Sequence, residues 1–208
     1  MQDLIQQEVF ELEVLDRLNS QRLLGELVFG GGTMLRLCFG LNRFSVDLDF
    51  WLARSTDRKK LFTKIKECLE ASYTLRDAAD KFNTLLFEVK SKVYPRSLKL
   101  EIRRELKRIK TEQAIAYSKY SNQQVFLNVV SLADMMQAKI ETFLSRGEIR
   151  DAFDMEFLFK KGQSLSAGPK ALKEVLKKIN RLSEKDYKVK LGSALEEGQR
   201  RYYLSENF

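Results

Sequence analysis

The sequence predicts an α+β protein, with a small mixed sheet and flanking helices over residues 1–125 and a helical part over 126–208. Short segments of the first half alternate apolar and polar residues, as strands do. The second half repeats its apolar residues every three or four positions, as helices do. With only 2 prolines and 10 glycines in 208 residues, the chain lacks the composition of a disordered or collagen-like protein.

The first twenty residues are predicted to form an amphipathic helix, because their apolar residues recur mostly in steps of three or four. These residues are Leu4, Ile5, Val9, Leu12, Leu15 and Leu18, with Phe10 and Val14 widening the face. Downstream, the apolar segment 27–29 runs into the glycine triplet 30–32, and a new helical pattern begins at Met34. This order indicates a short strand, a tight glycine turn and a second helix.

Further strands are predicted over 45–51, 84–90 and 97–103 from their alternating pattern. A helix is predicted over 57–72, and a short apolar run at 125–130 precedes the helical half. In the last of these strands, Leu98, Leu100 and Ile102 share one face. The other face carries Lys99, Glu101 and Arg103.

The helical half has recognisable boundaries. Ser131 is a good N-cap for a first helix, and Gly147 is placed to end it. A second helix is expected over about 149–161 and a third, lysine-rich, over about 169–182. Residues 183–208 are expected to be partly helical.

The composition narrows the chemistry. Lys+Arg 37 against Asp+Glu 29 gives a net charge of +8, which favours a polyanionic partner, nucleic acid before an acidic membrane. The absence of histidine excludes histidine triads, histidine-ligated zinc and imidazole acid–base catalysis. Cys38 and Cys68 are too few for a disulfide framework and are interpreted as small buried residues in a reducing compartment.

The sequence also bears on location. The chain opens on an amphipathic pattern rather than a signal peptide. Its longest apolar window, 27–41, is shorter than a membrane span and contains Arg36. We therefore expect a cytoplasmic protein with no membrane partner.

Asp47 and Asp49 lie two positions apart on a predicted strand, so their side chains share one face, roughly 7 Å apart at the Cα atoms. Two carboxylates this close repel each other, and a cation between them relieves the repulsion. Because no soft ligand is available, Mg²⁺ is the natural choice. Glu101 would join them if the two strands are neighbours. The alternative is that these acids form the solvated face of a half-buried sheet.

The glycine triplet 30–32 and Thr33 stand at a strand-to-helix turn. Bare backbone N–H groups at a helix N-terminus favour an anion such as phosphate, and a threonine hydroxyl can add to them. The segment matches neither a Walker A loop nor a dinucleotide fingerprint. A plain tight turn is the alternative.

Three charged residues lie among apolar helical residues. Lys139 falls inside an apolar stripe, where it must extend to solvent or meet an anion. Asp151 and Asp154 belong to a helix that is apolar almost all round, so both need partners, and Arg146 and Arg150 are available. A structural salt bridge and an active-site role are both open.

The segments 28–36 and 40–50 together resemble the first motif of the AbiEii/AbiGii-type nucleotidyltransferases. That motif is GGT-x-L-R-L followed by R-x-S-x-DLDF. The pairs Asp134…Lys139 and Arg146…Asp151 resemble the third and fourth motifs, and the likeness covers roughly residues 1–160. Where the family often has a lysine before GGT, this chain has Gly30.

The resemblance implies a DNA-polymerase-β-like nucleotidyltransferase core, with the helical part 126–208 packed on the active site. It implies a toxin of a toxin–antitoxin or phage-defence system, and MenT-like relatives that extend the 3′ end of tRNA. The implied cofactor is Mg²⁺ or Mn²⁺. The implied partners are a nucleoside triphosphate, an RNA acceptor and a cognate antitoxin.

The resemblance also implies roles for individual residues. Those implied to bind the nucleotide are Gly31, Gly32, Thr33, Arg43, Ser45 and Lys139. Those implied as catalytic are Asp47, Asp49, Lys139 and Asp151. The metal would be held by the two strand aspartates, and Glu101 occupies a plausible place for a third carboxylate.

The sequence therefore predicts metal-dependent nucleotidyl transfer from a nucleoside triphosphate to an RNA such as the tRNA 3′ end. The basic clusters 103–104, 107–108 and 170–181 would serve that acceptor, although such clusters are usually solvated helix faces. One alternative is the same fold modifying a protein or small-molecule hydroxyl. Another is a non-catalytic protein that binds RNA or an antitoxin.

Overall fold

The computed structural model describes residues 1–53, 56–103 and 109–203. The chain forms two compact units, and each is described by itself. The first unit comprises 1–40 and 44–130, and the second comprises 41–43 and 131–208. The predicted basic residues Arg104, Lys107 and Arg108 lie outside the described residues. Within the described ranges, no helix is long and apolar enough to cross a membrane.

The described part of the first unit contains a seven-stranded sheet in the order β3-β4-β5-β2-β1-β7-β6. The strands are β1 (Leu27–Gly30), β2 (Asp47–Leu52), β3 (Thr74–Asp80), β4 (Thr84–Lys90), β5 (Leu98–Arg103), β6 (Thr111–Tyr117) and β7 (Gln124–Val130). The pairs β2–β5 and β1–β7 are parallel and the others antiparallel, so the predicted mixed sheet is confirmed.

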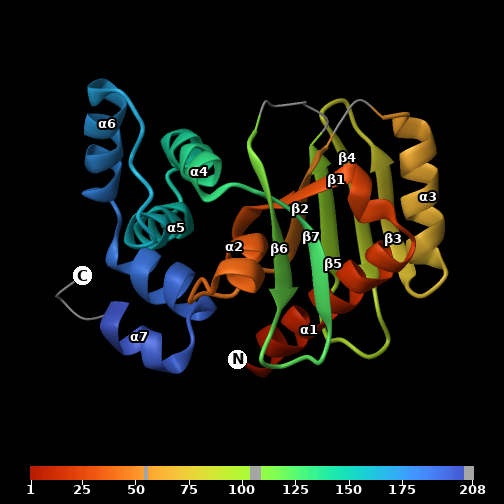
Figure 1. The fold of residues 1–208 in the computed structure, drawn as a ribbon. Coiled ribbons are helices and arrows are strands. Elements are labelled where there is room, and N and C mark those ends of the chain that lie inside the picture. The colour runs from red at the N-terminus through yellow and green to blue at the C-terminus, as the bar shows by residue number, and fades with distance from the viewer. Residues whose placement is uncertain (54–55, 104–108, 204–208) are drawn as a thin grey trace. The chain divides into compact units, whose positions relative to one another are not determined.

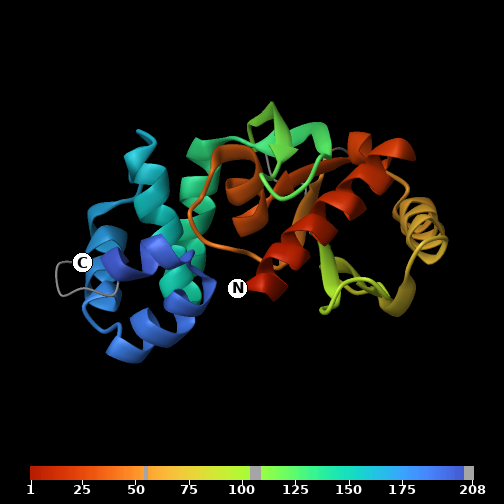
Figure 2. The same ribbon diagram turned by 90° about the horizontal axis from the view of Figure 1, so that it is seen from below.

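Helices pack on this sheet in the first unit (Figures 1 and 2). They are α1 (Gln2–Ser20), η1 (Leu23–Glu26), α2 (Gly31–Phe39) and α3 (Arg58–Glu70). α1 packs against β5 and β7, and α3 packs against β3 and β4. The side chain of Asp57 caps α3 by accepting a hydrogen bond from the Lys60 N–H at 3.1 Å.

The sequence pattern misplaced part of the buried face of α1. Leu4, Ile5 and Val9, which the helical period assigns to that face, are only half-buried. Three polar residues are buried instead, and they are Gln7, Glu8 and Glu11. The helical spacing of apolar residues locates only an apolar buried face. It therefore misses polar residues that are buried through hydrogen bonds and ion pairs.

Two strands, β3 and β6, were not predicted. Both are edge strands, and the exposure of their residues explains the omission. β3 contains no fully buried residue, and β6 buries only Ala116. An edge strand with little burial leaves no alternating apolar pattern to detect. The apolar run at 125–130, in contrast, belongs to β7, where it pairs with β1 and β6.

The second unit is helical. Its helices are α4 (Leu132–Arg146), α5 (Ile149–Lys160), α6 (Pro169–Ile179), η2 (Asp186–Leu191), η3 (Gly192–Ala194) and α7 (Glu197–Tyr203). The Ser131 hydroxyl caps α4 by accepting from the Asp134 N–H at 3.2 Å. Gly147 ends that helix at φ +67°, a left-handed conformation that favours glycine. Both predicted boundaries of α4 are confirmed.

Candidate active site

The acidic residues of the first unit lie on neighbouring strands. β2 pairs with β5 in parallel, and the register sets Asp49 opposite Glu101 and Asp47 opposite Lys99. Paired residues project to the same face of a sheet, so the three acids share one face. Asp47 is exposed, whereas Asp49 and Glu101 are half-buried. Like charges directly opposite each other destabilise a sheet, which makes this pair unusual.

The glycine turn meets these acids directly. Gly30 on β1 is the register partner of Asp49, and α2 begins at the next residue. Gly31 has φ +75°, and a Cβ atom there would lie 2.2 Å from the Asp49 Oδ2 atom. Only glycine allows this approach. The first N–H groups of α2 therefore lie beside a carboxylate, at a helix end that favours an anion.

Two side chains, those of Thr33 and Gln7, hold the starts of the acidic strands through three hydrogen bonds. Thr33 is buried, and its hydroxyl donates to the Asp47 carbonyl oxygen at 2.6 Å. The amide of Gln7 donates to the carbonyl oxygens of Val46 at 3.3 Å and Ser97 at 3.4 Å. Gln7 was missed by sequence reasoning. The signal was a glutamine within the apolar period of the first helix.

Trp51 accounts for the glycine at position 30. A Cβ atom on Gly30 would lie 1.9 Å from the Trp51 ring, so no larger residue fits while that ring is in place. Trp51 is opposite Arg103 in the register, and the guanidinium carbon lies 5.3 Å from the ring centroid. Gly30 thus leaves room for the Trp51 ring against the turn.

Two buried acids of α1, Glu8 and Glu11, interact with Arg36 of α2, the helix that follows the glycine turn. Glu8 forms an ion pair with Arg36 of α2 and accepts a hydrogen bond from Ser118. Arg36 also lies 3.8 Å from the Phe44 ring centroid. Burial, followed by repulsion from Glu8, raises the pKa of Glu11 well above its ordinary value, and Asp47 adds to this. The uncharged form of Glu11 is therefore favoured.

The donor set suits a hard divalent cation. Among the described residues, no group of three or more acidic, cysteine or histidine side chains could hold a metal ion by itself. Mg²⁺ in proteins usually takes one or two carboxylates together with substrate phosphates and water, rather than a cage of side chains. Asp47 and Asp49 beside the start of α2 fit that pattern. A metal-binding role for Glu101 stays a prediction.

In the second unit, Lys139 contacts acids and does not extend to solvent. Its Nζ atom lies 3.3 Å from Asp151 Oδ1 and 2.7 Å from Asp154 Oδ2, and the residue is only 7% exposed. Arg146 adds two hydrogen bonds to Asp151, at 2.6 and 2.9 Å. The two aspartates thus have the partners that their apolar helix requires.

Arg43 completes this network. Its Nε and Nη2 atoms donate to the two carboxylate oxygens of Asp154 at 2.7 and 2.6 Å. Burial alone would raise the pKa of Asp154, but Arg43 and then Lys139 outweigh it, so the pKa is lowered. The resemblance implied that Arg43 binds the nucleotide, and the structure shows its guanidinium paired with Asp154. Ser45, two residues before the first residue of β2 along the chain, is half-buried. The nucleotide-binding roles of both residues stay predictions.

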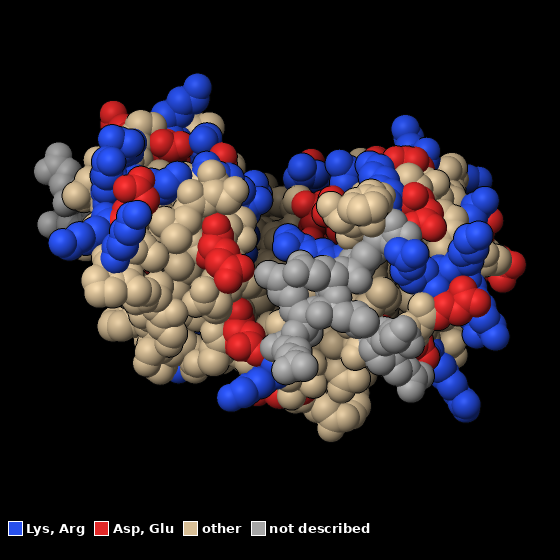
Figure 3. All heavy atoms as spheres, turned by 90° about the horizontal axis from the view of Figure 1, so that it is seen from above, with Lys and Arg blue, Asp and Glu red and all other residues tan. Residues whose placement is uncertain are grey.

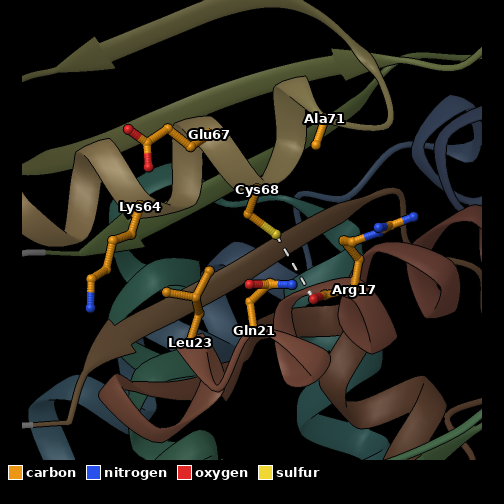
Figure 4. A pocket seen from close by; sticks show the side chains of 7 residues that line it. All are labelled: Arg17, Gln21, Leu23, Lys64, Glu67, Cys68 and Ala71. Atoms are coloured by element: carbon orange, nitrogen blue, oxygen red, sulfur yellow. Dashed lines mark hydrogen bonds between the residues drawn. The ribbon is translucent and has the colours of Figure 1, made fainter.

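The two cysteines belong to helices, Cys38 to α2 and Cys68 to α3. Cys68 lines a cavity of about 360 Å³ between α1 and α3, with Arg17 and Lys64 on its wall (Figure 4). Its thiol donates to the Arg17 carbonyl oxygen at 3.8 Å, and burial raises its pKa. Burial also raises the pKa of Cys38 to about 12. Cys68 is buried as predicted, whereas Cys38 is only half-buried.

Basic side chains are spread over the visible face of each unit, with acids between them (Figure 3). The α6 cluster is of this mixed kind, since Lys177 lies 3.7 Å from Glu174. The basic cluster 170–181 is in this respect an ordinary solvated helix face.

Comparisons with solved structures identify the class of protein. The chain is similar over 94% of its length to a proposed nucleotidyltransferase from Helicobacter pylori, covering 91% of that protein at 22% identity with a TM-score of 0.59. It is also similar over 92% of its length to JHP933 from Helicobacter pylori, covering 88% of that protein at 21% identity with a TM-score of 0.54. At this identity the likeness concerns the fold. No curated protein matches the sequence.

Comparison with models of protein families identifies the family to which the chain belongs. The model of the nucleotidyl transferase AbiEii toxin, type IV toxin–antitoxin system, matches residues 13–204, and the chain belongs to this family. The protein is therefore a nucleotidyltransferase, and the predicted family and fold are confirmed. Membership implies a nucleotide as substrate and an antitoxin as partner.

Proposed function

We propose that this enzyme transfers nucleotides from a nucleoside triphosphate to a cytoplasmic RNA acceptor such as the tRNA 3′ end, using Mg²⁺ or Mn²⁺. The approach of Asp49 to Gly31 carries the proposal, because it sets a carboxylate beside a helix start that favours phosphate. A carboxylate and a phosphate repel each other unless a divalent cation lies between them. Asp47 and Asp49 would hold that cation.

Each residue of the turn has a proposed task. The N–H groups of Gly31 and Gly32 bind the triphosphate, and the Thr33 hydrogen bond positions Asp47. A bound divalent cation supplies charge stabilisation for the reacting phosphates. The acceptor hydroxyl oxygen bonds to the α-phosphorus, the bond from that phosphorus to the bridging oxygen breaks, and pyrophosphate leaves. Asp49 and Glu101 are the candidate acceptors of the hydroxyl proton.

Lys139 and Asp151 are proposed as further members of the catalytic set. The 3.3 Å hydrogen bond between them supports the view that Asp151 orients the ammonium group. The sequence-based prediction that the helical part 126–208 packs on the active site belongs to this proposal. So does the prediction that Arg43 and Ser45 contribute to nucleotide binding.

The test uses the full chain with Mg²⁺, total tRNA and each α-³²P-labelled nucleoside triphosphate in turn. Wild type should label tRNA, and a chelator should stop the labelling until Mg²⁺ or Mn²⁺ is restored in excess. Asp47→Asn should lower the labelling by at least about 100-fold. Asp77→Asn, on the edge strand β3 and exposed, is the matched control and should keep the activity.

Other outcomes would count against the proposal. Label found on protein or on a small molecule would overturn the RNA acceptor. Absence of label from every acceptor with all four nucleotides would overturn the transfer itself. Equal losses in Asp47→Asn and Asp77→Asn would remove the assigned role of the β2 acids.

A further inference from the structure

A pocket of about 390 Å³ lies in the second unit, between α5 and α7. Four aromatic residues form much of its wall, and they are Phe153, Phe157, Tyr202 and Tyr203. Phe153 and Tyr203 are buried, with ring centroids 4.8 Å apart at an interplanar angle of 63°. Tyr202 stands against Tyr203 at 4.9 Å and 85° and is 55% exposed. Fixed rings thus support one ring that is open to a ligand.

Polar groups complete the pocket. The amide side chains of Asn42 and Gln199 line it, and neither has a hydrogen-bond partner within the described part of the chain. An amide offers a donor and an acceptor side by side, as the edge of a nucleobase does. Lys160 also lines the pocket, with its Nζ atom 5.9 Å from the Tyr202 ring centroid and 2.5 Å from Glu156 Oε1.

Cations flank the aromatic wall. Lys161 lies 5.5 Å from the Phe157 ring centroid, and Arg201 is exposed on α7 beside Tyr202. Aromatic platforms bordered by cations are how proteins hold single-stranded nucleic acid, with bases stacked on rings and phosphates near the cations. The neighbouring groove between α5 and α6 lacks this chemistry, because residues such as Phe159, Leu172 and Leu176 make it almost wholly apolar.

We propose that this pocket binds a nucleobase of the RNA acceptor, stacked on Tyr202 with its edge toward Asn42 and Gln199. The proposal rests on the proposed function for its choice of RNA. It adds a base-binding subsite made of residues of the second unit, none of which is an acid of β2 or β5. An acceptor would then be selected partly by an unpaired base, which favours single-stranded ends over duplex.

The test measures binding without chemistry, in the full-length Asp47→Asn variant. The probe is a short single-stranded RNA with 2-aminopurine at its 3′ end, whose fluorescence falls when the base stacks. Tyr202→Ala should weaken binding about tenfold and abolish the quenching. Phe159→Ala is the matched control, since Phe159 is 61% exposed on α5 and lies outside the pocket, and it should change neither.

A second test fills the pocket with a large side chain and uses a small side chain at the same position as the control. Gly198 lines the pocket, and a Cβ atom there meets no atom within 4 Å, so larger residues fit. Gly198→Trp should abolish the quenching, whereas Gly198→Ala should leave it intact. Circular dichroism of both variants checks that the helices are unchanged.

The outcomes separate this proposal from the proposed function. Equal binding by Tyr202→Ala and Phe159→Ala would overturn the pocket assignment even if tRNA is labelled normally. Quenching of the 2-aminopurine ribonucleoside triphosphate but not of the RNA would assign the pocket to the nucleotide substrate and overturn the acceptor subsite. If the pocket variants change RNA binding while wild type labels no RNA, the subsite stands and the transfer reaction falls.

Discussion

In the first unit, Asp49 lies across from another acid and is half-buried, whereas in the second unit Asp151 and Asp154 are fully buried and each contacts two cations. The buried acids have their charge balanced by their own unit, which is what burial requires. On the strands, Asp49 lies opposite Glu101 and beside the start of α2, and Asp47 lies opposite Lys99. Full burial with two cations is the arrangement of a structural ion network, which Lys139 and Asp151 have in addition to their proposed catalytic role. Carboxylates paired beside a helix start are the arrangement expected where a cation and a phosphate bind.

The largest expected effect on stability comes from removing a buried acid of the second unit. Asp154→Ala leaves Arg43 buried without its carboxylate and leaves Lys139 with Asp151 alone, so the free energy of unfolding should fall by about 3–5 kcal/mol. Urea denaturation measures it. The lowered pKa of Asp154 means that its stabilisation is present above the ordinary value of 3.8 and is lost as pH falls through the folded value. The difference between variant and wild type should therefore shrink in acid, and a constant difference would contradict this account.

Asp49→Asn tests the proposed metal and phosphate site. It should lower the transfer activity and leave the stability of the fold largely unchanged. Transfer should fall by about 10²–10³-fold, because a carboxylate at the reacting phosphates is lost. The free energy of unfolding should stay the same or rise slightly, since the charge opposite Glu101 is removed. Labelling assays and urea denaturation of the same preparation measure both. A loss of stability as large as that of Asp154→Ala would make Asp49 a structural residue.

Substitutions at two glycines with positive φ distinguish the effect of backbone strain on transfer from the effect of a contact with Asp49. Gly31→Ala and Gly40→Ala both place a side chain at positive φ, which costs roughly 1–3 kcal/mol. Only at Gly31 does the added Cβ meet Asp49, whereas at Gly40 it meets no atom within 4 Å. Transfer should therefore fall about tenfold or more in Gly31→Ala and persist in Gly40→Ala. Similar activity in the two variants would show that the approach to Asp49 is not needed.

The smallest effect concerns Glu11. Its raised pKa means that stability is fully present below the ordinary value of 4.5 and is lost as pH rises through the folded value. Glu11→Gln keeps the shape without the charge, so it should be more stable than wild type at neutral pH by about 1 kcal/mol. The gain should vanish below pH 4.5. Thermal unfolding across pH measures this, and a gain that is independent of pH would assign it to packing.

Much of the fold and part of the candidate site could be predicted from local sequence. Alternation in 45–51 and 97–103 predicted the strands β2 and β5, and their neighbouring placement confirmed that Glu101 lies beside Asp49. The hydrogen bonds of Gln7 could not be predicted, because its acceptors Val46 and Ser97 lie 39 and 90 residues along the chain. The same holds for Arg43, whose partner Asp154 is 111 residues away.

The sequence by itself determined the elements, the family motif and the residue types of the site, because periodicity, capping and turn chemistry act over a few residues. Only the tertiary structure decided which charges meet. It set Asp49 against Gly31 and Glu101, and it enclosed Lys139 between two aspartates of the second unit. The physical reason is that charge pairing depends on distance through space, which the register of strands and the packing of helices fix.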